Sequence, residues 1–191
     1  MILDRILPFA RTLLTKAISQ GDIAIDATIG NGHDTVFLAE LVGEQGHVYG
    51  FDIQKEAIDS ASGRLQEHNL QDRATLYLSG HEHVQSMLPS DESRNIGGAI
   101  FNLGYLPGGD KKIVTTPSTT ISAIEQIISM LKPEGILVLV IYHGHLEGII
   151  ERDQLVEYVE RLDQKKVHVL RYQFMNQQNN PPFIIAIEKR T

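Results

Sequence analysis

The stretch that decides the fold is residues 22–35, which read Asp22-Ile-Ala-Ile-Asp-Ala-Thr-Ile-Gly-Asn-Gly-His-Asp-Thr35. An apolar strand pattern ends at Asp26, and a loop with two glycines, Gly30 and Gly32, follows at once. From about Asp34 the apolar residues recur at the spacing of a helix with one buried face. A strand, a glycine loop and a helix in this order predict the first unit of a layered α/β fold with a mostly parallel sheet.

The alternation of strands and helices continues to the end of the chain. Further strands are predicted at 47–51, 74–78, 98–101 and 136–142, and a terminal hairpin pairs 167–174 with 182–188. A helix follows the second strand, another covers 149–162, and a third begins at Thr116, whose hydroxyl is the expected N-cap before Pro117. We therefore expect a single domain over residues 1–191 with helices on both faces of the sheet.

Composition limits the functions that the chain can carry. The 191 residues include 17 basic and 24 acidic ones, for a net charge of −7, so binding to nucleic acid requires a local basic patch. The absence of cysteine excludes thiolate metal sites, iron–sulfur clusters and a cysteine nucleophile. The amino terminus lacks the unbroken apolar stretch of a signal peptide, and the longest apolar run, 136–142, is too short to span a bilayer, so we expect a soluble cytoplasmic protein.

The residues at the ends of five consecutive predicted strands are mostly polar or glycine. Because the carboxyl ends of parallel strands meet at one edge of a sheet, where α/β folds bind their ligands, these residues should lie together. They are Asp26, Thr28, Gly30, Asn31, Gly32, His33, Asp34 and Thr35, then Asp52, Ile53 and Gln54, then Gly80, His81 and Glu82, then Asn102, Leu103, Gly104 and Tyr105, and finally Tyr142, His143 and His145.

The first two groups predict an adenosine-containing cofactor. Gly30 and Gly32 allow close approach of a ligand to the backbone, and Asp52, 20 residues beyond Gly32, suits the hydroxyls of a ribose. Thr35 stands where a dinucleotide fingerprint has its third glycine, and the chain has no P-loop. Asp26 favours the cationic amino group of S-adenosylmethionine (SAM) over a pyrophosphate, which it would repel.

At this point the chain resembles the class I SAM-dependent methyltransferases. Asp26-x-x-x-Gly30-x-Gly32 matches their first motif, and Asp52 matches their ribose-binding acid. Asn102-x-x-Tyr105 lies where amine-methylating members carry Asn/Asp-Pro-Pro-Tyr, although Leu103 and Gly104 replace the two prolines. The resemblance implies a Rossmann-like, seven-stranded, mostly parallel sheet with one antiparallel strand, and a SAM site built from the residues that follow the first four strands.

A narrower resemblance adds a substrate. Four longer strings, 26–35, 101–110, 141–145 and 181–189, are similar to a small family labelled rRNA methylases. Members of that family are associated with methylation of the aminomethyl group of wobble 5-aminomethyl-2-thiouridine in tRNA. The resemblance implies a tRNA methyltransferase whose partner is the anticodon region. Methylation of rRNA, methylation of a small-molecule amine and a non-catalytic nucleotide-binding module are the alternatives.

The expected chemistry is direct transfer of a methyl group to an uncharged amine. The side-chain carbonyl of Asn102 would orient the amine, Tyr105 would stack on the uracil, and His143, His145 or Asp34 would accept the proton, with no basis in the sequence for choosing among them. Further contacts to the RNA are expected from Gly104, Leu106, Lys111, Lys112, Tyr142, Arg171, Asn176 and Asn179.

Two features have second interpretations. The pairs His81-x-His83 and His143-x-His145 have a spacing that also suits metal ligands, but we expect no metal, since adenosine contacts or a base role account for these histidines. The amino-terminal helix, with Ile6, Leu13 and Leu14 among its apolar residues, either covers the sheet or forms a homodimer interface.

Overall fold

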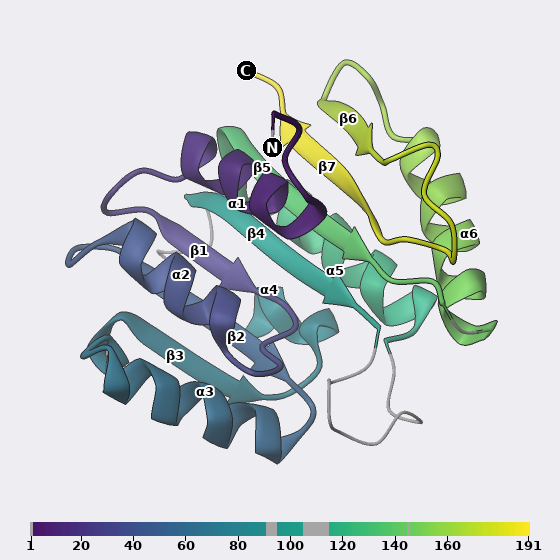
Figure 1. Cartoon of the computed structure of the whole chain (residues 1–191). Helices are drawn as coiled ribbons and strands as arrows, with labels where there is room; N and C mark the ends of the chain where they lie inside the picture. Colours follow the sequence, from purple (N-terminus) through teal and green to yellow (C-terminus); the bar gives the residue numbers. More distant parts are fainter. Residues whose placement is uncertain (1, 91–94, 105–114, 145) are drawn as a thin grey trace.

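The computed structural model describes residues 2–90, 95–104, 115–144 and 146–191. Seven strands form one sheet in the order β3-β2-β1-β4-β5-β7-β6 (Figure 1). Their bounds are β1 Ile23–Asp26, β2 His47–Asp52, β3 Ala74–Leu78, β4 Ile96–Leu103, β5 Leu131–Ile141, β6 Val167–Tyr172 and β7 Phe183–Lys189. β7 runs antiparallel to both of its neighbours, and the pairs among β1 to β5 are parallel. The predicted seven-stranded, mostly parallel sheet with one antiparallel strand is confirmed.

Helices cover both faces of this sheet (Figure 1). On one face lie α1 Ile6–Ala17, α2 His33–Val42 and α3 Lys55–Glu67, and on the other α4 Val84–Met87, α5 Pro117–Met130 and α6 Leu146–Glu160. Two short 3-10 turns, η1 Gln71–Arg73 and η2 His81–His83, flank β3. The alternation of β5 divides the core, since Val138 and Val140 pack with α1 and α2 while Leu137 and Leu139 pack with α5 and α6.

The amino-terminal helix covers the sheet, as one of its two interpretations predicted. Its buried residues Ile6, Ala10 and Leu14 pack over β5 and β7. The Phe9 ring stacks on Tyr172 at the end of β6, with ring centroids 3.9 Å apart, and the Tyr172 hydroxyl donates to the Asp4 carbonyl at 2.7 Å. The first helix is thus fixed to the last two strands of the chain.

Several boundaries differ from the predictions. β4 extends two residues further at each end than 98–101, and β5 begins at Leu131, so the expected turn before residue 136 is a register shift within the paired strands. α6 begins at 146 and β6 ends at Tyr172. Thr116 stands at the N-cap before Pro117, but its hydroxyl pairs with the Thr119 hydroxyl at 2.8 Å and caps no backbone N–H, a correction to the predicted cap.

Candidate active site

The loop between β1 and α2 is tied to the end of β2 by one carboxylate. Asp52 accepts the Gly30 N–H on Oδ2 at 3.0 Å and the Gln54 N–H on Oδ1 at 2.9 Å. A carboxylate has about four acceptor positions, so each oxygen keeps one for a further donor. Asp52 is only partly buried, and its neighbour Ile53 is 60% exposed. The end of β2 therefore offers a fixed double acceptor beside an apolar surface.

Asp26 lies beneath the same loop. Its carboxylate is completely buried and accepts the Thr28 N–H at 3.2 Å and the Thr35 hydroxyl at 2.6 Å. Burial, and after it the negative charge of Asp34, raise the pKa of Asp26 from 3.8 to about 7. The side chain thus shapes the loop from inside, while its contact with a bound cofactor stays a prediction.

Gly32 is required by packing, and its predicted approach to a ligand stays a prediction. It is left-handed, with φ of 77°, and a Cβ on it would lie 2.6 Å from the Cα of Ala61 in α3. The missing side chain is therefore required by packing of the loop against α3. Gly30 is also left-handed, with φ of 53°, and its N–H is the one held by Asp52.

A chain of polar contacts links α1 to the end of β4. The Asn102 amide donates to Asp34 Oδ2 at 2.7 Å, and Arg11 donates to Asp34 Oδ1 at 2.9 Å. The Asn102 backbone N–H donates to the Thr28 hydroxyl at 2.7 Å, which joins β4 to the glycine loop. Because an ionised carboxylate can only accept, Asp34 fixes the amide with its NH2 inward and turns the carbonyl oxygen of Asn102 elsewhere.

Tyr142 completes this group from the next strand. Burial, and then the charge of Asp34, raise the pKa of the Tyr142 phenol, so the ring is neutral at pH 7. Its backbone N–H donates to the Leu103 carbonyl at 3.2 Å, and the ring is 40% exposed. A Cβ on Gly104 would lie 3.5 Å from the Cβ of Tyr142. The predicted residues Asp34, Asn102 and Tyr142 are brought together by the fold.

His81 is buried where β3 leads into η2. Its Nδ1 lies 3.0 Å from the Ala27 carbonyl, which requires a proton on that nitrogen. Burial lowers the pKa of His81, so the ring is neutral and Nε2 is an acceptor. Nε2 is buried without a partner in the part of the chain that the structure describes, and Phe101 packs edge-on at 5.2 Å between ring centroids. Next to it, the Glu82 carboxylate fills the space beside Gly80.

Two predicted residues have surroundings that differ from those expected. His143 follows Tyr142 directly, so its side chain points to the opposite face of the sheet, where it packs against Phe183 away from Asn102. The side chain of Leu103 is completely buried in the core, and its carbonyl is bound by Tyr142. Neither side chain lies with the Asp34–Asn102 pair.

The remaining predicted residues fall into three sets. Asn31 lies at the end of the loop, and His33 is the first residue of α2. The Asn31 carbonyl accepts a hydrogen bond from Arg64 at 2.9 Å. Arg171 lies in β6, an edge strand of the sheet, and Asn176 and Asn179 lie in the β6–β7 connection. Tyr105, Leu106, Lys111, Lys112 and His145 lie outside the described residues.

Three residues that contribute here were not among those predicted from the sequence. Arg11 neutralises Asp34, Arg64 holds the Asn31 carbonyl, and Leu78, the neighbour of Asp52 on β3, is 58% exposed. Arg11 and Arg64 lie on helices remote in sequence from the residues they bind, so no local motif marks them. Leu78 could have been found only as the last residue of a predicted strand.

Within 2–90, 95–104, 115–144 and 146–191, no three His, Asp or Glu side chains are grouped as a metal ion would need. No helix among the same residues has the length and apolar character to cross a membrane.

The sequence of this chain is similar to that of known proteins. The family model described as “Putative rRNA methylase” matches residues 48–188. An Arabidopsis thaliana protein, the chloroplastic tRNA (mnm(5)s(2)U34)-methyltransferase, is 33% identical over 188 residues, which are 94% of this chain and 68% of that protein.

Two solved structures are also similar. An rRNA-methylase structure from Clostridium thermocellum has a TM-score of 0.94 at 41% identity, covering 98% of each chain. A methyltransferase from Streptococcus mutans in complex with SAH has a TM-score of 0.88 at 37% identity, covering 98% of this chain and 99% of that one.

The contact of Gly32 with α3 predicts a loss of stability on substitution. Gly32→Ala should lower the free energy of unfolding by about 3 kcal/mol, because the new Cβ meets backbone and the left-handed φ is strained. Urea denaturation measures this. Gly63→Ala, in α3 with no atom within 4 Å of the added Cβ, is the matched control and should raise stability by about 0.5–1 kcal/mol. An unchanged urea midpoint for Gly32→Ala would contradict the packing role.

The raised pKa of Asp26 predicts a pH-dependent gain for Asp26→Asn. The folded chain binds a proton that the unfolded chain releases near pH 3.8, so Asp26 costs stability increasingly as pH rises towards its folded pKa of about 7. Asparagine carries no charge and can still accept from Thr28 and donate to Thr35. The variant should match the wild type near pH 4 and exceed it by up to about 4 kcal/mol at pH 8. Equal unfolding curves at both pH values would disprove the assignment.

Proposed function

This chain belongs to the family described as “Putative rRNA methylase” and is a SAM-dependent methyltransferase, and on that premise we propose that it methylates the aminomethyl group of wobble 5-aminomethyluridine, or of its 2-thio form, in tRNA. The observation that carries the proposal is the orientation of Asn102. Asp34 holds its amide group, which leaves a fixed carbonyl oxygen as an acceptor for an amine N–H. The name of the Arabidopsis relative, which specifies a modified uridine at position 34, supports the same substrate.

The residues present fit the cofactor. Asp52 keeps one acceptor position on each oxygen for the two hydroxyls of a ribose, and Ile53 and Leu78 give an apolar surface for an adenine. The unpaired Nε2 of His81 is an acceptor at the same edge. When bound, SAM supplies a methyl group on a positively charged sulfur. We assign its binding to the loop from Thr28 to Asp34, to 52–54 and to 80–82.

The substrate amine is bound on the Asn102 side of this edge. The Asn102 carbonyl accepts one amine N–H, which aims the nitrogen lone pair at the methyl carbon. Asp34 would take the proton that the amine must lose before it can act as a nucleophile, directly or through water, and bound SAM would supply the methyl group. Among the described candidates for the base, Asp34 is the one in contact with Asn102, since His143 faces the other side of the sheet.

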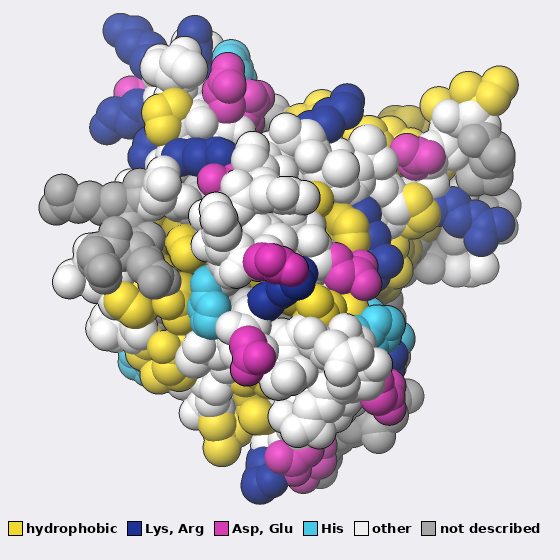
Figure 2. Space-filling model, turned by 90° about the vertical axis from the view of Figure 1, so that its left-hand side faces the viewer, with side chains coloured by type: hydrophobic (Ala, Val, Ile, Leu, Met, Phe, Trp, Pro, Cys, Tyr) yellow, Lys and Arg dark blue, Asp and Glu magenta, His cyan; other side chains and the backbone are white. Residues whose placement is uncertain are grey.

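The proposed partner is the anticodon region of tRNA, bound at the carboxyl edge of the sheet. Figure 2 shows the opposite side, where β1 and β4 begin, and there acidic and basic side chains are mixed. Tyr142 offers an exposed ring beside Asn102. Gly104 has no side chain and so leaves the space next to Tyr142 open. Tyr105, Leu106, Lys111 and Lys112 remain proposed RNA contacts. The exposed Leu3, which precedes α1, and the exposed Leu7, in its first turn, support a homodimer, and a tRNA substrate supports a cytoplasmic site of action.

Nucleoside mass spectrometry of total RNA tests the substrate. In cells that lack the gene, the methyl group should be missing from the wobble aminomethyl uridine of tRNA, and the unmethylated amine should accumulate. Restoring the gene should reverse both changes. A methyl group missing from rRNA instead, with tRNA unchanged, would transfer the assignment to rRNA. Unchanged tRNA and rRNA would contradict an RNA substrate and favour a small-molecule amine.

Two substitutions should separate catalysis from cofactor binding. Asn102→Ala should reduce kcat about a hundredfold or more while the affinity for S-adenosylhomocysteine changes little, because it removes the acceptor that aims the amine and the amide contact with Asp34 but leaves Asp52 in place. Asp52→Ala should abolish binding of the same cofactor product in calorimetry. Wild-type turnover by Asn102→Ala would contradict the positioning role of Asn102. Unchanged affinity of Asp52→Ala for S-adenosylhomocysteine would contradict the ribose-binding role of Asp52.

A further inference from the structure

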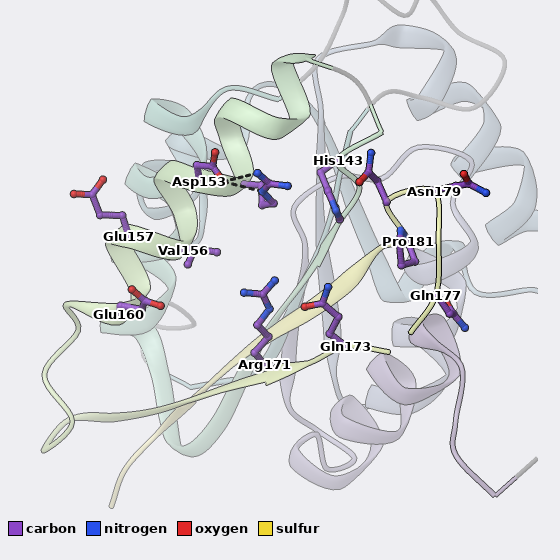
Figure 3. A pocket seen from close by; sticks show the side chains of 12 residues that line it. His143, Asp153, Val156, Glu157, Glu160, Arg171, Gln173, Gln177, Asn179 and Pro181 are labelled. Carbon is purple, nitrogen blue, oxygen red and sulfur yellow. Dashed lines mark hydrogen bonds and ion pairs between the residues drawn. The ribbon is translucent and has the colours of Figure 1, made fainter. Parts of the chain in front are cut away.

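A pocket opens on the face of the sheet opposite to the one that carries the Asn102 side chain. It lies between α6, β6 and the β6–β7 connection and has a cavity volume of about 640 Å³. Figure 3 shows Arg171, Gln173 and His143 directed into this space, with Asn179 and Pro181 on the connection that closes one side. Its volume is within the usual range for small-ligand pockets, about 300–1,000 Å³.

The pocket shares the carboxyl edge of the sheet with the candidate active site. Leu103, Ile141 and Phe183 form one row across β4, β5 and β7. His143 and Pro181 each lie two residues beyond that row, as the chain leaves β5 and enters β7. Two strand spacings, about 10 Å, separate β4 from β7. A strand of RNA that crosses this edge at Asn102 can therefore also reach the pocket.

The charges around the pocket balance too closely for a polyanion. Arg152 is paired with Asp153 at 2.7 Å, and Glu157 is paired with Arg161. Glu160 adds a further acid to the lining. Burial, and then the positive charge of Arg152, lower the pKa of His143, so its ring is neutral at pH 7. Arg171 is the cation in the lining that has no ion pair with a side chain of the described ranges.

Phe183 carries two flat groups that border the cavity. The Arg171 guanidinium lies over its ring, 4.3 Å from the centroid, and the His143 ring packs edge-on at 5.5 Å between centroids. His143 is 5% exposed, and its Nδ1 is buried with no hydrogen-bond partner in the described part of the chain. The guanidinium is itself planar, so its side away from the Phe183 ring offers a surface on which a base can stack.

The rest of the lining is rich in amides, from Gln173, Gln177, Asn179 and Asn180. Amides pair with the edges of nucleobases, which alternate donors and acceptors in the same way. Asn179 and Asn180 are left-handed, with φ of 65° and 50°, so their backbone turns the connection back over the cavity. We propose that this pocket binds an unpaired nucleobase of the RNA next to the nucleotide being methylated, stacked on Arg171 and read by the amides. The inference rests on the proposed RNA substrate.

Binding of a labelled anticodon stem–loop RNA that carries 5-aminomethyluridine at the wobble position, followed by fluorescence anisotropy, tests this pocket without any need for methyl transfer. Asn179→Gly and Asn180→Gly remove the amides and keep the left-handed backbone, and each should weaken binding about tenfold. Arg171→Lys keeps the charge but loses the flat stacking surface, so it should weaken binding by a similar factor. Asn69→Gly, at a left-handed turn after α3 with φ of 56°, is the matched control and should bind as the wild type does.

Salt dependence distinguishes a base contact from a phosphate contact. In all three pocket variants the slope of log affinity against log salt should equal that of the wild type, because no phosphate contact is lost. Wild-type affinity in these variants would overturn the proposal. So would a flatter slope for Asn179→Gly or for Asn180→Gly, or full affinity in Arg171→Lys alone, since each of these results indicates a phosphate site.

A parallel assay of methyl transfer to the same RNA keeps the two proposals separate. The KM for RNA should rise with the loss of affinity in the pocket variants. If wild-type protein binds the RNA, the variants bind more weakly and no methyl is transferred, the proposed reaction is wrong and the pocket stands. If the wild type does not bind the RNA, both proposals fall.

Discussion

Three carboxylates, Asp26, Asp34 and Asp52, are crowded at the carboxyl ends of β1 and β2, and the site depends on how their mutual repulsion is relieved. Each is handled differently. Asp26 is buried and its pKa is raised to about 7, so that it is partly protonated at neutral pH. Asp34 is neutralised by Arg11, and Asp52 is held by two backbone N–H groups. The negative charge that remains suits the cationic sulfonium and amino groups of SAM, which agrees with the similar structure from Streptococcus mutans in complex with SAH.

The two-residue period of β5 then divides the chemistry between the faces of the sheet. Tyr142 continues the face of Val140 and joins Asn102, whereas His143 continues the face of Ile141 and enters the pocket beside Phe183. Tyr142 and His143 are adjacent in the sequence and thus lie on opposite faces of the sheet. A ligand that bridges both must wrap around the edge of the sheet, as an extended single strand with splayed bases can do.

Much of the fold and of the candidate site could be predicted from the sequence, because the order of the strands, the glycine loop and the polar strand ends are local signals. The segment 22–35 predicts β1, the loop and the start of α2, and the spacing of Asp52 places it beside the glycine loop, where it accepts the Gly30 N–H. The rest depends on tertiary contacts. Arg11 acquires its role only when α1 docks, Gly32 is explained by Ala61 on another helix, and the face taken by His143 depends on where β5 ends. The pocket of α6 needed the hairpin to close over a helix, which no single motif describes.

The docking of α1 has a consequence for synthesis of the chain. α1 is synthesised before the strands on which it packs, and among these β7 and the Tyr172 ring at the end of β6 follow latest. α1 can therefore dock on β4 and β5 first, while its contacts with the hairpin form only after β6 and β7 have left the ribosome. Contact of this helix with the hairpin completes the packing of its face of the sheet.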